Sequence, residues 1–158
     1  MKLLKVVALA GLLSLHLNAE NMEEARLIYN DYSAQEIAQA TSEELAKSAP
    51  MQVDEISYIA SSNHLDSTVV VNTIVEEAAL KELAHIDTKG MAKGEKEEFV
   101  KGFINNLKQL QLNALCTTPM TRAAMEKGVR YSYVYRWDNF IYLGEVNIDN
   151  EACENSKL

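Results

Sequence analysis

The spacing of apolar residues predicts two long helical segments. Between Met22 and Lys47, apolar positions recur at three- and four-residue steps among acids and amides, which is the period of an amphipathic helix. Capping-box patterns that start at Ser33 and Thr41 indicate two shorter helices or one bent helix, and Pro50 ends the segment. A second segment runs from Glu95 to Leu115, and its wide apolar stripe is expected to lie on a sheet. The stripe consists of Phe99, Val100, Phe103, Ile104, Leu107, Leu110 and Ala114.

Weaker signals predict two further helices. Residues 78–85 have helical periodicity, and residues 89–94, which are rich in glycine and lysine, are typical of an exposed loop. Pro119 stands where a helix starts, residues 120–127 continue it, and Gly128 is placed to end it.

Alternating and β-branched runs predict two hairpins. Residues 51–61 and 67–75 flank a polar turn. Residues 129–137 alternate between aromatic and more polar side chains, and residues 140–148 return after the turn at Asp138, with Gly144 expected at a bulge or a close approach. The order of helices and hairpins predicts an α+β fold, in which an antiparallel sheet of about four strands carries helices packed on one face.

The first 19 residues have the pattern of a secretory signal peptide. Lys2 and Lys5 precede an apolar run from Val6 to Leu17, and Ala19 is a small residue at the expected cut. This run is shorter than the roughly 20 residues that span a bilayer. We therefore expect a signal peptide at 1–19, an N-terminal helical segment at 20–49 and an α+β domain at 50–158, located in the periplasm or outside the cell. No stable membrane insertion is expected after cleavage.

Two cysteines are expected to form one disulfide. An oxidising compartment would pair Cys116 with Cys153, and closing that loop should stabilise the fold by about 4 kcal/mol. The competing interpretation is a reactive thiol, but the chain has no CxxC spacing to support it.

Charge and composition argue against several function classes. Removing Lys2 and Lys5 with the leader would leave 13 basic residues against 23 acidic ones, a formal charge of −10, which disfavours nucleic-acid binding. His64 and His85 show no metal-ligand spacing, and no nucleophile motif or phosphate loop is present. We expect no metal, no cofactor and no catalytic residue, although a hydrolase site assembled only by the fold stays an alternative.

Aromatic side chains are concentrated near the C-terminus, where six of the eleven Phe, Tyr and Trp residues fall between Tyr131 and Tyr142. Such a ladder could hold a peptide segment, or it could pack against the apolar stripe of the long helix. Two arginines on the opposite strand face could recognise a partner's carboxylate, or they could simply be solvated. The candidate partner-binding residues are Tyr131, Tyr133, Tyr135, Trp137, Arg130 and Arg136.

Three stretches carry a resemblance to known proteins. They are Pro50 to Asp54, Cys116 to Arg122, and Gly128 to Tyr133 with the closing Cys153. Together they resemble small exported bacterial α+β proteins with one C-terminal disulfide and, more distantly, the AspS class of type II secretion pilotins. The resemblance implies a protein that binds a segment of another envelope protein. Pilotins of that class are lipoproteins, whereas this chain has no cysteine directly after its predicted leader.

These observations predict a non-catalytic periplasmic accessory protein, such as an envelope assembly or secretion factor, that binds another envelope protein or peptide segment. The alternative is an inhibitor or immunity protein that acts on an envelope enzyme, because a small acidic domain is steered toward basic targets.

Overall fold

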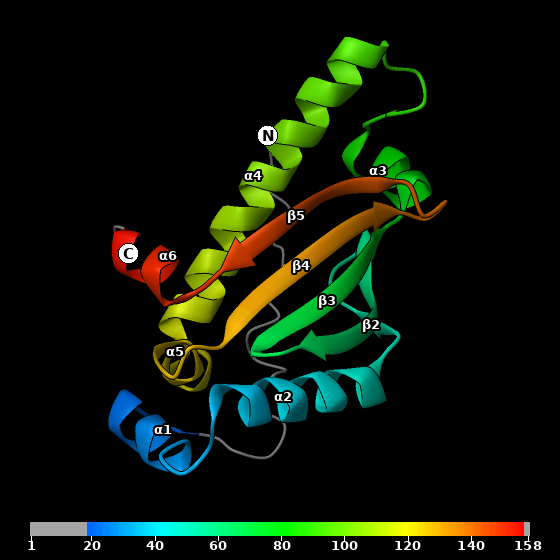
Figure 1. The fold of residues 1–158 in the computed structure, drawn as a ribbon. Helices are drawn as coiled ribbons and strands as arrows, with labels where there is room; N and C mark the ends of the chain where they lie inside the picture. The colour runs from blue at the N-terminus through cyan, green and yellow to red at the C-terminus, as the bar shows by residue number, and fades with distance from the viewer. Residues whose placement is uncertain (1–18, 157–158) are drawn as a thin grey trace.

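A computed structural model of the protein describes residues 19–156 (Figure 1). All but the last residue of the predicted signal peptide, 1–19, therefore lies outside the described residues. The helices are α1 (Met22–Ile28), α2 (Ala34–Ser48), α3 (Glu77–Ala84), α4 (Lys93–Thr117), α5 (Pro119–Glu126) and α6 (Asn150–Asn155). The strands are β1 (Met51–Gln52), β2 (Ser57–Leu65), β3 (Thr68–Val75), β4 (Arg130–Trp137) and β5 (Tyr142–Ile148).

The five strands form one mixed sheet in the order β1-β2-β3-β4-β5. The predicted hairpins, β2 with β3 and β4 with β5, are confirmed. The prediction of a purely antiparallel sheet of about four strands is wrong, because the two central strands β3 and β4 are parallel and the short β1 adds a fifth strand. The connection between β3 and β4 contains three helices, so it is long enough to return the chain in the same direction.

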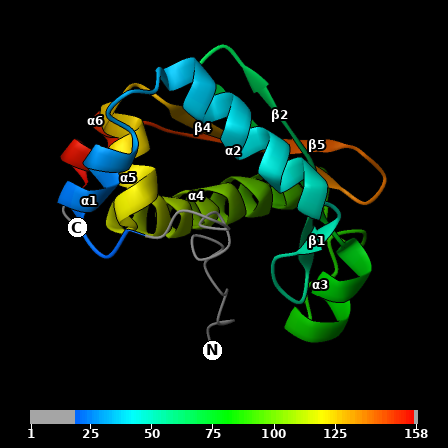
Figure 2. The ribbon, with the colours of Figure 1, turned by 90° about the horizontal axis from the view of Figure 1, so that it is seen from below.

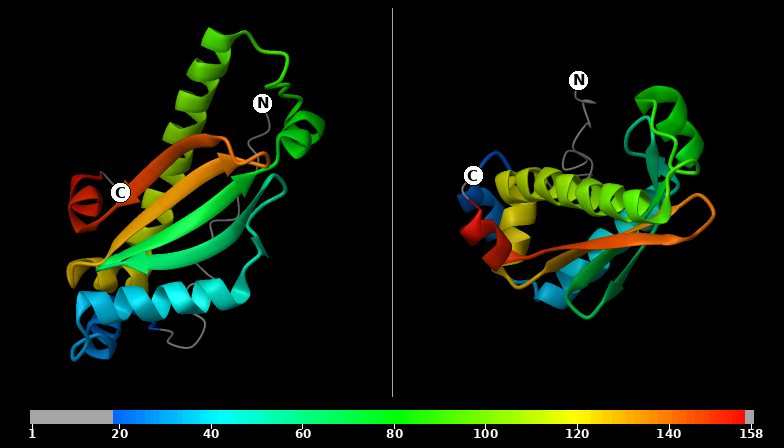
Figure 3. Two further views of the ribbon diagram at one scale, coloured as in Figure 1. Left: turned by 45° about the vertical axis from the view of Figure 1, so that its right-hand side comes forward. Right: turned by 90° about the horizontal axis from the view of Figure 1, so that it is seen from above.

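Helices α2 and α4 both pack on one face of the sheet. On β3 and β4 the side chains of Val69, Val71, Tyr131 and Tyr133 are buried beneath the helices. The residues that alternate with them along each strand are more exposed or point to the opposite face of the sheet. Helix α2 packs on β2 and β3, and α4 packs on β5. Figure 1 shows α4 crossing behind β5 and α2 running below the other edge of the sheet, and Figure 3 shows the same arrangement from two further sides. The opposite face of the sheet carries no helix among residues 19–156.

The N-terminal helices are joined to the rest of the chain through packing and an ion pair. Ser33 caps α2, and the capping box with Glu36 is present as predicted. Helix α1 packs on α5, where Arg26 and Glu126 form a two-pronged ion pair at 2.7 and 2.9 Å. Figure 2 shows α1, α5 and α6 gathered at one end of the molecule. This end also holds the Cys116–Cys153 disulfide that the sequence predicts. The bond ties the end of α4 to α6, a short helix that the sequence analysis did not predict.

The apolar stripe of α4 is covered unevenly. Leu112, Ala114 and Leu115 in its C-terminal half are buried, whereas Phe99 and Phe103 in its N-terminal half are only half-buried. Figure 1 shows the start of α4 extending past the sheet. The stripe is therefore fully covered only in the second half of the helix, while Phe99, Val100, Phe103 and Ile104 pack against the core with part of their surface exposed.

Gly144 lies at a close approach of β5 to α4. A Cβ added at this position would lie 2.9 Å from Cγ1 of Ile104, which is closer than packed carbon atoms allow. The predicted close approach at this glycine is thus confirmed, and the absence of a side chain lets β5 lie against the helix.

Replacing Gly144 with alanine should lower the free energy of unfolding by about 1 to 2 kcal/mol, because the new methyl group overpacks the contact with Ile104. The same replacement in an Ile104→Ala background should cost little, and urea unfolding of the four proteins in this cycle measures the coupling. Gly102→Ala is the control, since nothing lies within 4 Å of that position. If Gly144→Ala lowers the free energy of unfolding equally in both backgrounds, the contact with Ile104 is not the reason that alanine is unfavourable at position 144.

Candidate partner-binding groove

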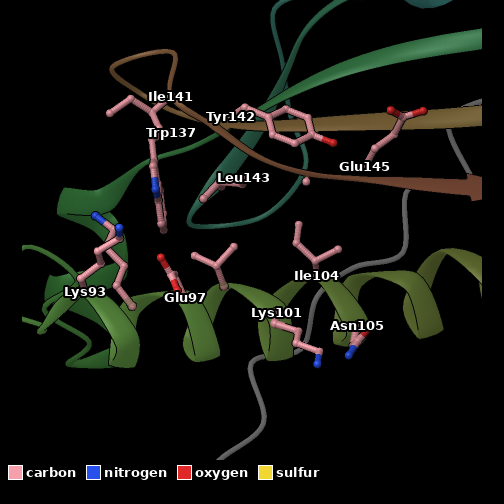
Figure 4. Close-up of a pocket in the computed structure, with 13 residues that line it drawn as sticks. Lys93, Glu97, Lys101, Ile104, Asn105, Trp137, Ile141, Tyr142, Leu143 and Glu145 are labelled. Atoms are coloured by element: carbon pink, nitrogen blue, oxygen red, sulfur yellow. The ribbon is translucent and has the colours of Figure 1, made fainter.

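A groove of about 580 Å³ lies between the N-terminal half of α4 and the edge strand β5 (Figure 4). Helix α4 supplies one wall, and the end of β4, the following turn and β5 supply the other. The lining residues are Lys93, Lys96, Glu97, Val100, Lys101, Ile104, Asn105, Trp137, Ile141, Tyr142, Leu143, Gly144 and Glu145.

The floor of the groove is apolar. Trp137 and Leu143 point from the strands toward the helix in Figure 4, and Ile104 points back toward them. Trp137 is 1% exposed, whereas Val100 and Ile104 are half-buried. The floor therefore offers apolar surface that the protein itself covers only in part.

The rim of the groove is an apolar turn between β4 and β5. Three consecutive residues from this turn to the start of β5 are mostly exposed: Phe140 by 75%, Ile141 by 60% and Tyr142 by 58%. Phe140 has a φ of 65°, the left-handed conformation that glycine adopts at this place in a three-residue hairpin loop. The turn thus displays a large aromatic side chain at a position where glycine would be less strained.

A buried ion pair holds the start of α4 in place. Glu77 is 4% exposed, and its Oε1 atom accepts hydrogen bonds from the Thr88 hydroxyl at 2.6 Å and from Lys96 Nζ at 3.1 Å. Lys96 Nζ also lies 5.5 Å from the centre of the Trp137 ring. These contacts connect α3, α4 and the end of β4, so they fix one wall of the groove relative to its floor.

The environment of Glu77 favours the carboxylate. Burial alone would raise the pKa of Glu77, but the hydrogen bonds from Thr88 and Lys96, together with the charges of Lys96 and Lys89, lower it below the ordinary value of 4.5. The carboxylate therefore stabilises the fold fully above about pH 4.5, and this stabilisation is lost as the pH falls through the lowered folded-state pKa.

Glu77→Gln should lower the free energy of unfolding by about 2 kcal/mol at pH 7, since it removes a charge-assisted hydrogen bond from a buried site. The loss should shrink as the pH falls below 4.5. Urea unfolding between pH 3 and 7 measures both effects. Glu82→Gln, at an exposed position on the same helix, is the control and should change stability at pH 7 by less than about 0.5 kcal/mol. A pH-independent cost at Glu77 would contradict the role of its charge.

Two groove lysines have no ion-pair partner in the described part of the chain. Lys93 and Lys101 are exposed and join no salt bridge there, in contrast to Lys96. Glu145 accepts a hydrogen bond from the Ser132 hydroxyl at 2.8 Å. The groove lining thus holds these two lysines together with two glutamates, Glu97 and Glu145, so it carries no excess of positive charge once Lys96 is paired with Glu77.

The six sequence-predicted partner residues occupy three different places. Tyr131, Tyr133 and Tyr135 are 2 to 3% exposed and lie in the core, where burial raises the pKa of each phenol, to about 12 for Tyr135. Arg130 is exposed at the start of β4, and Arg136 donates a hydrogen bond to Asn72 Oδ1 at 3.0 Å on the side of the sheet without helices. Only Trp137 lines the groove.

Sequence reasoning did not single out the two lysines or the apolar turn. A turn is normally polar, so the aromatic and aliphatic residues that follow Asp138 and Asn139 were a signal that could have identified the rim. The lysines could not be identified, because their pairing state depends on which acidic side chains the fold brings near them.

Metal ligands and membrane spans were also sought among residues 19–156. No group of three or more His, Cys, Asp or Glu residues there is arranged to hold a metal ion. In the same range, no helix combines the length and apolar character needed to cross a bilayer.

Comparison with known proteins finds similarity at the level of the fold. No protein-family model and no curated protein sequence matches the chain. The pilotin EpsS of the Vibrio vulnificus type 2 secretion system aligns with a TM-score of 0.58 and 11% identity, over 78% of this chain and 94% of EpsS. The type II secretion pilotin AspS from Vibrio cholerae aligns with a TM-score of 0.54 and 13% identity, over 84% of this chain and 98% of AspS.

A third similar structure is a Pseudomonas aeruginosa protein provisionally described as secreted. It aligns with a TM-score of 0.57 and 10% identity, over 76% of this chain and 92% of its own. The chain therefore shares the pilotin fold, and the structural resemblance to AspS-class pilotins expected from the sequence is confirmed.

Proposed function

We propose that the protein is an exported, non-catalytic accessory factor of the bacterial envelope that binds a segment of another envelope protein in the groove between α4 and β5. Export is supported by the Cys116–Cys153 disulfide, because such bonds persist in oxidising compartments such as the periplasm. The signal-like pattern of residues 1–19 supports the same location.

The groove with its apolar rim carries the proposal. Exposed apolar residues scattered singly are common on protein surfaces, but three in succession beside an apolar groove are typical of an interaction site. Partners bind through exposed aromatic and aliphatic anchors, and Phe140 and Ile141 provide them at the rim of this groove.

The fold comparison supports an envelope role. Two of the similar structures are named as pilotins of type II secretion systems, and a third is described as secreted. We therefore place the chain among envelope assembly or secretion factors, as a periplasmic protein whose partner is proteinaceous.

Affinity capture from envelope extract tests the proposal with a matched pair of variants. Ile141→Glu puts a charge on the groove rim, whereas Leu27→Glu makes the same change on α1 at a site that is 71% exposed. We expect the wild-type protein and Leu27→Glu to enrich the same envelope protein and Ile141→Glu to lose it. Equal enrichment by all three proteins would exclude the groove as the binding site, and no specific enrichment by any of them would refute partner binding.

The acidic charge favours an inhibitor or immunity protein as the second candidate function. Binding to a basic enzyme through a charge of −8 should weaken steeply with salt, whereas binding through the apolar groove should depend on salt only weakly. Capture repeated from about 0.05 to 0.5 M salt separates the two functions.

A further inference from the structure

The cut predicted after Ala19 lies directly before the first helix of the fold. Asn21 is the N-cap of α1, and its Oδ1 atom accepts a hydrogen bond from the Glu24 N–H at 3.0 Å. Only Glu20 stands between this cap and the predicted cut. A chain that loses residues 1–19 therefore begins one residue before the folded domain.

Helix α1 is attached to the domain by few contacts. Ala25 is fully buried and packs with Met120 and Ala123 of α5 in a cluster separate from the main core. The Arg26–Glu126 ion pair adds a second attachment. A helix of seven residues is not stable by itself in water, so each contact at its ends affects how often α1 leaves α5.

One contact at the start of α1 involves the atom that cleavage would change. The backbone nitrogen of Glu20 donates a hydrogen bond to Glu24 Oε2 at 2.8 Å. In the uncleaved chain this donor is a neutral amide. After a cut between Ala19 and Glu20 the same nitrogen belongs to an α-ammonium group, which is mostly protonated at pH 7 because the pKa of such groups is about 8. The hydrogen bond to Glu24 would then join two opposite charges.

Glu24 has no competing cation in the described part of the chain. It joins no salt bridge there, and Arg26, the one basic residue of α1, is paired with Glu126. Together with Glu20 and Glu23, it gives the start of α1 three acidic side chains, so a positive charge at residue 20 offsets part of their repulsion. The helix dipole alone disfavours a cation at this end, so the benefit depends on the contact with Glu24.

We infer that cleavage between Ala19 and Glu20 creates an ion pair between the new α-ammonium group and the Glu24 carboxylate, and that this pair strengthens the docking of α1 on α5. A processing peptidase of the envelope hydrolyses the Ala19–Glu20 peptide bond. Water adds its hydroxyl to the Ala19 carbonyl carbon and a proton to the Glu20 nitrogen, and that nitrogen takes up a further proton from solvent. The ion pair replaces the small apolar contact that Ala19 makes with the α1–α5 cluster. This inference rests on the proposed function, because only an exported chain meets such a peptidase.

The first test is the mass of the exported protein, purified from a bacterial host that expresses the full chain. We expect Glu20 as its first residue. An exported chain that begins at another residue would overturn the inference and leave export intact. A chain that keeps Met1 and stays in the cytosol would refute export and the inference together.

The second test measures how often α1 leaves α5, by hydrogen exchange of the α1 amides at low salt. Two forms of the purified protein are compared, one beginning at Glu20 and one beginning at Ala19, whose ammonium group lies one residue earlier. Glu24→Gln should speed exchange about threefold in the first form and less than about 1.5-fold in the second. The threefold effect should shrink at about 0.5 M salt, because the pair is exposed.

Glu23→Gln is the matched control, since it removes a carboxylate from the same turn of α1 without touching the Glu20 nitrogen. Its effect on exchange should be the same in the two forms, because its interaction with the helix dipole does not depend on where the chain begins. If Glu24→Gln also changes exchange equally in both forms, the ammonium group does not pair with Glu24. That result overturns the inference, while the proposed export and partner binding stand.

Discussion

Replacing Cys116 and Cys153 with serine should lower the free energy of unfolding by about 4 kcal/mol. The disulfide joins residues separated by 37 positions, so removing it restores the entropy of a long loop to the unfolded chain. It also releases α6, a helix of only six residues, from the end of α4. Urea unfolding of the variant and of the wild-type protein measures the difference.

The wild-type protein treated with a reductant serves as the control, because it loses the same bond without a change of sequence. The serine variant and the reduced wild-type protein should unfold at similar urea concentrations. A difference below about 1 kcal/mol between oxidised and reduced protein would show that packing of α6 alone holds the C-terminus in place.

Trp137→Ala should lower the free energy of unfolding by about 3 to 5 kcal/mol, which is typical when a large buried side chain is truncated. The ring is 1% exposed and lies beneath Lys96, so its removal opens a cavity. It also removes the contact with Lys96, the residue of α4 that pairs with Glu77 of α3. Thermal and urea unfolding measure the loss.

Tyr142→Ala is the matched control for Trp137→Ala, since it removes an aromatic side chain from the same groove at a residue that is 58% exposed. This change should cost less than about 1 kcal/mol. Similar losses in both variants would mean that Trp137 contributes no more to the core than a surface residue does.

Most elements of the fold could be predicted from local sequence. The capping box at Ser33, the alternation along β4 and the helical period of α4 depend on neighbouring residues only, and each produced the expected element. The direction of β4 relative to β3 could not be predicted this way, because side-chain alternation is the same in parallel and antiparallel strands.

The candidate site was less predictable than the fold. The aromatic ladder was visible in the sequence, but alternation along one strand does not say whether its aromatic face lies under helices or faces a partner. The tertiary structure places Tyr131, Tyr133 and Tyr135 in the core and leaves Phe140 and Ile141 at the surface. Phe140 and Ile141 are more hydrophobic than the three tyrosines, so hydrophobicity would predict the opposite order of burial, and only the positions of α2 and α4 explain it.

The sequence by itself determined most of the segments that become helices and strands, which cysteines pair, and that the chain is acidic, because these properties follow from residue type and local spacing; the short α6 and the two-residue β1 were not predicted. Only the tertiary structure decided that β5 is an open edge, that the start of α4 extends past the sheet, and that Lys96 rather than Lys93 or Lys101 is neutralised by Glu77. The physical reason is that an edge, a groove and an ion pair are relations between segments far apart in the chain, and each depends on how the helices pack on the sheet.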